Sequence, residues 1–372
     1  MRLNIQSVKS LINKIKMISL ISIISGLFLL SGCGKYESTF KSYDLVVAKV
    51  NAEMANGTDG YITINIGKDV SEEDLSNINY SIDTMQGNVT SITTYKKSAL
   101  SDSRKVKLTI ERADAMYVYD HILDGKEIPP DKTKAKELSE VCEKILKNLI
   151  KSGMSDYEKE LAIHDYIVDN CSYGLSKEKD DSEYSAYGVL INHKAVCSGY
   201  ASAMNLLLNC AGVDSEVISG KAFSLNSSDK KIENHAWNLV RIDGEWYHLD
   251  ATWDDPVGES DALSHEFFNI PDSIMKKTHT WDVSKYRKCS HMEYNYYKYK
   301  GAYISDLTSL ENYLKVQIMN GQDKVDCVLN NLDIDENDLM FLYGIDRVKT
   351  VGYSMSDQSE YRILVVYINR PQ

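Results

Sequence analysis

The feature that most constrains this chain is a pair of alternating segments on either side of Asp243-Gly244. Residues 234–242 (Asn-His-Ala-Trp-Asn-Leu-Val-Arg-Ile) and 245–252 (Glu-Trp-Tyr-His-Leu-Asp-Ala-Thr) have the alternation of β-strands. An Asp-Gly pair between two such segments predicts a two-residue hairpin turn. Closing the hairpin at this turn pairs Ile242 with Glu245. The fold must therefore be built around two antiparallel strands in a defined register.

This register brings a histidine and an aspartate onto one face of the hairpin. It places His235 opposite Thr252. Asp250 lies opposite Trp237, so His235 and Asp250 are diagonal neighbours within side-chain reach. Such a carboxylate can hold one imidazole nitrogen while the other nitrogen faces a nucleophile. A purely structural cross-strand hydrogen bond is the alternative interpretation. His248 shares the face of Asp250 and is a rival base, although it is nearer the turn.

A cysteine at the start of a predicted helix is the candidate nucleophile. Apolar residues follow Cys197 at helical spacing, and Gly212 ends the pattern as a C′ glycine. Unpaired N–H groups at a helix N-terminus stabilise a thiolate, which is the reactive form of cysteine. Gly199 allows another chain or a substrate to approach closely. The alternative is a buried cysteine that opens a core helix.

Two further helices are expected before this cysteine. Residues 135–149 have apolar positions at helical spacing that include Cys142. Ser155 and Glu158 form a capping box at the start of the next helix. The apolar stripe of that helix includes His164, which we expect to be a core residue with satisfied hydrogen bonds and not a catalytic one.

The order of these motifs resembles the transglutaminase-like superfamily. The resemblance rests on Cys197, on Asn-His-Ala-Trp-Asn around His235, and on His-Leu-Asp-Ala-Thr-Trp-Asp-Asp-Pro around Asp250, and it covers roughly residues 130–290. Ser185-Ala186-Tyr187-Gly188 and Phe267-Phe268-Asn269 extend it. The resemblance implies an α+β, papain-like core in which a helix carrying the cysteine packs on an antiparallel sheet carrying the histidine and aspartate. It also implies that Cys197 is the nucleophile, His235 the base and Asp250 the residue that orients the base.

The resemblance implies thiol-dependent acyl transfer from peptide or carboxamide bonds, by a peptidase or amidase if water accepts the acyl group and by a transglutaminase if an amine does. It implies no metal and no organic cofactor. Members of the superfamily usually have a polar side chain upstream of the cysteine that helps to form the oxyanion hole. Tyr187 and Asn192 are both candidates for this role, beside the backbone N–H of Cys197.

Tryptophans near the hairpin allow two interpretations. Trp237, with Trp246 and Trp253, is a candidate for the wall of the substrate cleft, and packing is the alternative.

Two non-enzymatic functions also stay open. One is a surface module that binds protein or cell-wall polymer and keeps a relic triad. The other is an assembly factor in which the segments flanking the core do the main work.

The N-terminal segment predicts export and a lipid anchor. A leader with four basic residues and no acidic one precedes the apolar run of residues 17–30, which is shorter than a membrane-spanning helix requires. Leu30-Ser31-Gly32-Cys33 then resembles a lipobox. We therefore expect a signal peptide at 1–32 and a lipidated Cys33 with a tether at 33–41. The expected location is the outer face of the cytoplasmic membrane, at the cell surface.

Charge and cysteine content limit the partners. The formal charge is −12, which argues against a nucleic-acid partner. We expect a protein, peptide or cell-wall substrate, while the oligomeric state stays open. The cysteines show no C-x-x-C pair or regular spacing, so neither a zinc site nor a dense disulfide framework is indicated. Besides Cys33 and Cys197 there are five, so at least one is a free thiol in a monomer, and most are expected to be buried.

Small α/β modules are expected on both sides of the core domain, at residues 42–125 and 300–372. Each has the predicted order strand, helix, hairpin, which suggests a weak internal repeat. The predicted elements are, in the first module, strand 61–66, helix 69–75 and hairpin strands 89–95 and 106–111, and in the second, strand 325–329, helix 333–339 and hairpin strands 348–353 and 361–368.

Overall fold

The structure is a computed structural model that describes residues 39–80, 86–95, 103–175, 181–223, 232–255, 263–345, 348–356 and 362–370. The predicted signal peptide and Cys33 lie outside these residues. The chain divides into two compact units, Met1–Met116 and Tyr117–Gln372, and each is described by itself. Among the described helices, none combines the length and apolar character that crossing a bilayer requires.

The first unit is a four-stranded sheet with helices packed against it. The strand order is β1-β2-β4-β3, with β1 parallel to β2 and the other neighbours antiparallel. Val46, Val50 and Met54 line the buried side of α2 in the core of this unit. The predicted acidic helix start is present, because Ser71 forms a capping box with Asp74. The elements are β1 (Thr39–Phe40), α2 (Tyr43–Ala55), β2 (Gly60–Ile66), α3 (Glu72–Ser76), η1 (Ile78–Tyr80), β3 (Gly87–Thr94) and β4 (Arg104–Arg112).

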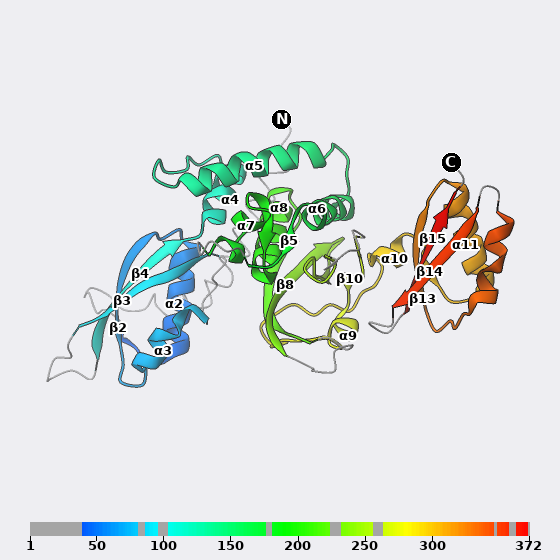
Figure 1. The fold of residues 1–372 in the computed structure, drawn as a ribbon. Coiled ribbons are helices and arrows are strands. Elements are labelled where there is room, and N and C mark those ends of the chain that lie inside the picture. Colours follow the sequence, from blue (N-terminus) through cyan, green and yellow to red (C-terminus); the bar gives the residue numbers. More distant parts are fainter. Residues whose placement is uncertain are drawn as a thin grey trace, which may run out of the picture. The chain divides into compact units, whose positions relative to one another are not determined.

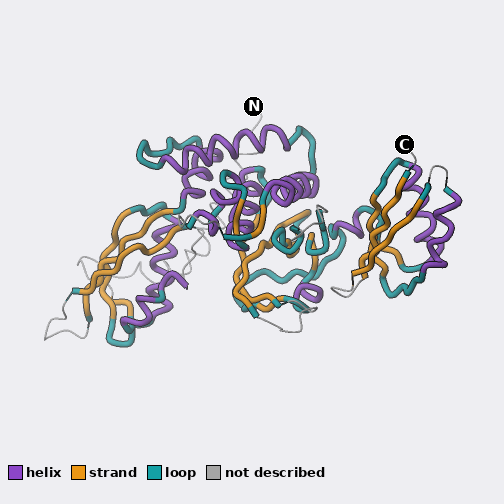
Figure 2. The backbone as a smooth tube through the Cα atoms, viewed as in Figure 1, coloured by secondary structure: helices purple, strands orange, loops and turns teal. Residues whose placement is uncertain are grey.

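Helices of the second unit cover one side of its larger sheet (Figures 1 and 2). The predicted capping box of Ser155 and Glu158 opens α6. Asn238 of the sheet donates from Nδ2 to the Ala201 carbonyl of α8 at 3.0 Å, which ties the sheet to the helix that carries Cys197. The elements up to α8 are α4 (Asp114–Asp124), α5 (Thr133–Leu149), α6 (Asp156–Asn170), β5 (Ser172–Tyr173), η2 (Ser182–Tyr184), α7 (Ala186–Leu190), β6 (Lys194–Ala195) and α8 (Cys197–Cys210).

The predicted hairpin is the centre of this five-stranded sheet, whose order is β10-β9-β8-β7-β11. Its register is confirmed from Ile242 opposite Glu245 to Asn238 opposite Leu249. Asp243 and Gly244 both have positive φ, at 50° and 91°, as a type I′ turn requires. The elements are β7 (Ser215–Ala222), β8 (Glu233–Ile242), β9 (Glu245–Leu249), β10 (Phe268–Ile270), α9 (Asp272–Met275), β11 (His279–Thr280) and α10 (Tyr296–Tyr299).

The C-terminal residues of the second unit form a further four-stranded sheet. Its order, β12-β13-β15-β14, repeats that of the first unit position by position. The structure adds a leading strand and helix to each copy, which the sequence analysis missed, and it makes the predicted helix 333–339 a 3₁₀ helix. The predicted domain boundaries themselves remain predictions. The elements are β12 (Tyr303–Ile304), α11 (Leu307–Met319), β13 (Lys324–Leu329), η3 (Glu336–Gly344), β14 (Thr350–Ser356) and β15 (Arg362–Asn369).

Candidate active site

Cys197 is the first residue of α8, as the sequence predicts. Val196, in extended conformation, is the N-cap, and the Cys197 side chain is half-buried. The segment before the helix is held by the Val196 N–H, which donates to the Glu183 carbonyl at 3.0 Å. A Cβ on Gly199 would lie 2.4 Å from that same carbonyl oxygen. The close approach expected at Gly199 is therefore made by the chain itself.

His235 and Asp250 meet at the open end of the hairpin. Asp250 directly follows the last residue of β9, and its Oδ2 lies 2.7 Å from His235 Nε2. The other carboxylate oxygen, Oδ1, accepts the N–H groups of Thr252 at 3.1 Å and Trp253 at 3.3 Å. Asp250 is almost fully buried, so these bonds fix the carboxylate behind the imidazole.

A second histidine, which the sequence analysis missed, binds the same carboxylate oxygen. His279 Nε2 lies 3.1 Å from Asp250 Oδ2, and His279 Nδ1 is 2.8 Å from Thr278 Oγ1. His279 belongs to the two-residue strand β11 at the edge of the sheet, beside β7. A strand this short leaves no periodic signal in the sequence, so no sequence pattern indicated it.

The charges of these groups follow from their surroundings. Burial alone would lower the pKa of His235, but the Asp250 carboxylate, together with hydrogen bonds to Asp250 and Cys197, raises that pKa to about 10. Burial opposes ionisation of Asp250, yet the two histidines hold its pKa well below the usual range. Burial lowers the pKa of His279 in spite of Asp250. At neutral pH, a cationic His235 therefore faces an anionic Asp250, with His279 neutral behind them.

The Cys197 thiol is a neighbour of the His235 ring, because it contributes to the raised pKa of His235. Because Nε2 of His235 faces Asp250, Nδ1 is the ring nitrogen left for the thiol. Burial and then the charge of Cys197 raise the pKa of Tyr173, whose side chain is partly exposed. No sequence pattern indicated Tyr173 as a neighbour of Cys197.

The predicted oxyanion candidates bind other elements. The Tyr187 hydroxyl donates to Glu137 of α5. Asn192 donates from Nδ2 to Ser182 Oγ at 2.8 Å. Neither contact involves a residue of the proposed triad, so a role in the oxyanion hole remains a prediction for both.

The structure corrects the expectation for Trp237. Its side chain is 1% exposed and stacks on the His235 ring, with centroids 5.9 Å apart. A side chain that is this buried has no surface for a substrate, so Trp237 packs beneath His235. The alternation of the strand predicts which face Trp237 lies on but not what covers that face.

His164 and His248 are engaged elsewhere. His164 is fully buried and contacts the carboxylates of Asp165 and Asp254. His248 accepts the Trp237 indole N–H on Nδ1 at 2.9 Å and faces Asp272 with Nε2 at 3.0 Å. Both ring nitrogens of each histidine are thus occupied. Neither histidine is free to act as the base for Cys197.

Comparison with known proteins agrees with this geometry. Residues 143–251 match the family model of the transglutaminase-like superfamily. The chain contains a transglutaminase-like domain. The α+β core predicted from the sequence is thereby confirmed. The superfamily includes both cysteine peptidases and transglutaminases.

More distant similarities are found among curated proteins and solved structures. The human kyphoscoliosis peptidase is 25% identical over 143 residues, which are 37% of this chain and 21% of that protein. The mouse kyphoscoliosis peptidase is 27% identical over 135 residues, or 33% of this chain and 20% of that protein. The match thus spans about a fifth of these relatives. A solved structure described as a TGase aligns with 55% of this chain and 54% of its own, at 13% identity and a TM-score of 0.27.

Proposed function

We propose that this protein is a thiol-dependent acyl-transfer enzyme that cleaves peptide or carboxamide bonds, with Cys197 as nucleophile, His235 as base and Asp250 as the residue that orients the base. The observation that carries the proposal is the position of the His235 ring. Its Nε2 is 2.7 Å from Asp250, and Cys197, the first residue of α8, acts on it closely enough to raise its pKa. This is the geometry of a nucleophile, a base and an orienting group.

In the first half of the reaction, the Cys197 sulfur attacks the carbonyl carbon of the substrate. The carbonyl oxygen becomes an oxyanion, and the backbone N–H of Cys197, the first residue of α8, can donate to it. His235, cationic at neutral pH, gives its proton to the leaving nitrogen. The C–N bond breaks, an amine or ammonia leaves, and a thioester to Cys197 remains.

In the second half, an acceptor attacks the thioester carbon. His235 removes a proton from this acceptor, and the sulfur leaves as a thiolate. Water yields a carboxylic acid, and a primary amine yields a new amide. Asp250, buried and anionic, holds His235 in one orientation and stabilises its cationic form throughout.

We further propose that the enzyme is exported and anchored at the cell surface through a lipid on Cys33. The leader and the lipobox-like Leu30-Ser31-Gly32-Cys33 support this location. Its substrates would then be proteins or peptides at the surface, including the peptides of the cell wall.

A product analysis tests the proposed chemistry. The protein without residues 1–32 is incubated with a peptide library, with and without added primary amine, and the products are read by mass spectrometry. We expect acids without amine, amine conjugates if the enzyme is a transglutaminase, and neither from Cys197→Ala. His291→Ala, a change at a partly exposed histidine, is the control that should match the wild type.

Thiol labelling separates the enzyme from the non-catalytic binding module. Iodoacetamide at mildly acidic pH should modify Cys197 first, because Cys197 is half-exposed, opens helix α8 and interacts with the cationic His235. Burial raises the pKa of the other five described thiols, which are Cys142, Cys171, Cys210, Cys289 and Cys327. If Cys197 reacted no faster than these and no product formed, the proposal would fail and the binding module would be favoured.

A further inference from the structure

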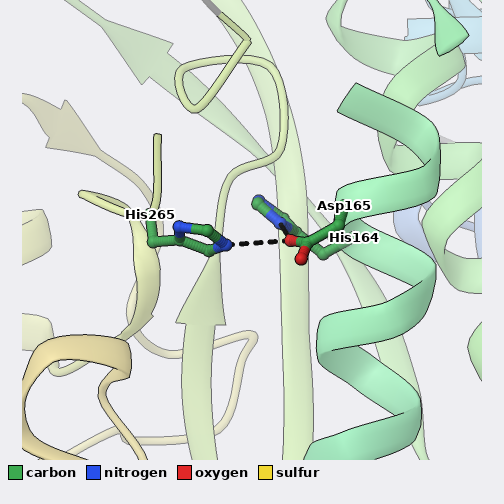
Figure 3. A group of neighbouring side chains, drawn as sticks. All are labelled: His164, Asp165 and His265. Atoms are coloured by element: carbon green, nitrogen blue, oxygen red, sulfur yellow. Dashed lines mark hydrogen bonds and ion pairs between the residues drawn. The ribbon is translucent and has the colours of Figure 1, made fainter. Parts of the chain in front are cut away.

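A second cluster of histidine and aspartate shares no residue with the proposed triad. His164 and Asp165 project from α6, and His265 precedes β10 (Figure 3). Asp165 Oδ1 lies 3.0 Å from His164 Nδ1 and 2.8 Å from His265 Nε2. Two imidazole nitrogens and a carboxylate oxygen, from segments about a hundred residues apart, thus converge within 4.8 Å of one another.

The rear nitrogen of His164 has the partner that a metal-bound histidine typically has. His164 Nε2 lies 3.1 Å from the carboxylate of Asp254, which is fully buried. A carboxylate at this position keeps a proton on Nε2 and orients the ring, so that the Nδ1 lone pair can bind a metal ion. This Nδ1 faces Asp165 Oδ1 at 3.0 Å. A divalent cation would take the same lone pairs and supply more positive charge between the two carboxylates.

Two other groups of possible ligands in the described part of the chain lack this arrangement. In the group of His248, Asp272 and Cys289, the Trp237 N–H donates to His248 Nδ1. The proton of a neutral His248 is then on Nε2, toward Asp272, so no lone pair faces the group.

The group of His235, Asp250 and His279 is the proposed active site. Both rings turn Nε2 toward one Asp250 oxygen. The imidazoles of His235 and His279 therefore hold the Asp250 carboxylate. This is the arrangement expected of a catalytic base and a neighbouring histidine.

The cluster on α6 is also rigid and accessible. His164 is fully buried, and the His265 ring stacks on Tyr296 with centroids 3.7 Å apart and planes 3° from parallel. The Asp165 side chain is 34% exposed. Fixed ligands reduce the entropy cost of binding, and the exposed part of the Asp165 side chain gives an ion a path from solvent.

We propose that His164, Asp165 and His265 bind a transition-metal ion, with Zn²⁺ as the ion that fits best. Two imidazoles and one carboxylate are ligands that Zn²⁺ prefers, and three protein ligands plus water complete a tetrahedron. The ion would clamp α6 to the segment leading into β10. Through Asp254, it would also hold the loop that follows Asp250.

Metal titration of the full chain without residues 1–32 tests this site. After chelation and buffer exchange, Zn²⁺ is titrated in competition with a chromophoric chelator. We expect one ion per chain, and affinity lower by more than about 100-fold for Asp165→Asn and His265→Gln. The matched control is Asp169→Asn, one turn further along the same helix and exposed, which should bind as the wild type does. Asp254→Asn should weaken binding by about 10- to 100-fold.

Cobalt spectroscopy shows which ligands are used. Co²⁺ in the proposed site should give visible bands typical of a tetrahedral nitrogen and oxygen site, without a thiolate charge-transfer band. A thiolate band would place the ion at a cysteine and overturn the proposal. Unchanged affinity in Asp165→Asn, or no binding by the wild type, would also overturn it and leave a network of hydrogen-bonded charges. If His265→Gln fails to fold, the isosteric Asp165→Asn decides the outcome.

Discussion

The Asp250 carboxylate is the most heavily bonded group of the proposed active site. One oxygen faces both His235 and His279, and the other accepts two backbone N–H groups. A carboxylate with this many donors stays ionised even when buried. His235 is therefore held by a partner that is itself immobile, which fixes the direction of its other nitrogen toward Cys197.

The triad should respond to mutation as one unit. Cys197→Ala and His235→Ala should each lower kcat by about 10⁵- to 10⁶-fold, and the double variant should cost little more, because both act in one step. Asp250→Asn should be milder, at about 10⁴-fold. Steady-state and single-turnover kinetics measure these losses. His248→Gln should keep most activity if it folds. If it abolished turnover while His235→Ala stayed active, the base would be wrongly assigned.

His279 should act as a positioning residue through Asp250. His235 loses its positive charge as the pH rises through its pKa of about 10. This loss sets the alkaline limit of activity. His279→Phe removes a hydrogen-bond donor from Asp250, so more of the negative charge of Asp250 acts on His235. The pKa of His235 should then rise, and the alkaline limit of activity should move to higher pH. We expect kcat to fall about 10-fold or more, with little change in KM. A destabilised variant with an unshifted pH profile would mean that His279 has only a structural role.

At the scale of single elements, local features could be predicted and distant pairings could not. The turn at Asp243-Gly244 determines the register of the hairpin, and the capping box at Ser155 determines the start of α6, because each depends on residues a few positions apart. His279 and His265 approach their partners from segments far away in the sequence. No spacing rule connects such residues, so His279, the fourth member of the proposed active site, and the second cluster were both missed.

The contact between α6 and β10 predicts a dependence of stability on pH. Asn269 donates from Nδ2 to Glu160 Oε2 at 2.7 Å, and Glu160 Oε1 and Asn269 Oδ1 have no partner among the described residues. Burial raises the pKa of Glu160 to about 8. Between about pH 4.5 and 8, the folded protein therefore holds a proton that the unfolded chain has lost, and the free energy of unfolding falls as the pH rises.

Glu160→Gln should remove this dependence. Glutamine keeps an oxygen acceptor for Asn269 and has no charge at any pH. The free energy of unfolding of the variant, taken relative to that of wild type, should rise by more than about 1 kcal/mol from pH 5 to pH 8. Urea denaturation at the two pH values measures the difference. Parallel pH profiles for the two proteins would contradict a buried, protonated Glu160.

At the scale of the whole molecule, the two flanking sheets have the same strand order, and each begins with a short parallel strand and a helix of 13 residues. The sequence predicted the strand, helix and hairpin order of each copy because the longer strands alternate clearly. It did not predict the leading strands, since β1 and β12 have two residues each. The repeated modules lie outside the transglutaminase-like match at 143–251, so they are a separate feature of this chain.

The predicted lipid anchor can be tested on the intact protein. Cys33→Ser should prevent lipidation and release the protein from the membrane fraction, or leave its signal peptide in place, because the lipobox requires the cysteine thiol. Fractionation and intact-mass measurement of the mature protein distinguish these outcomes. A diacylglycerol-type anchor has enough acyl chains for stable binding. Normal processing and full membrane retention in the variant would contradict a lipid on Cys33.

The tight turn at Asp243-Gly244 also bears on the order of events during refolding. His235 and Asp250 are 15 residues apart and are joined by a hairpin, and hairpins close within about 1–10 µs. Cys197 and His279 reach them only through contacts between distant segments, which form later because loop closure costs more entropy. The base and its carboxylate thus meet early, while the thiol stays without its activating partner until the helix has docked. A refolding chain therefore acquires the reactivity of its thiol only at the end of folding.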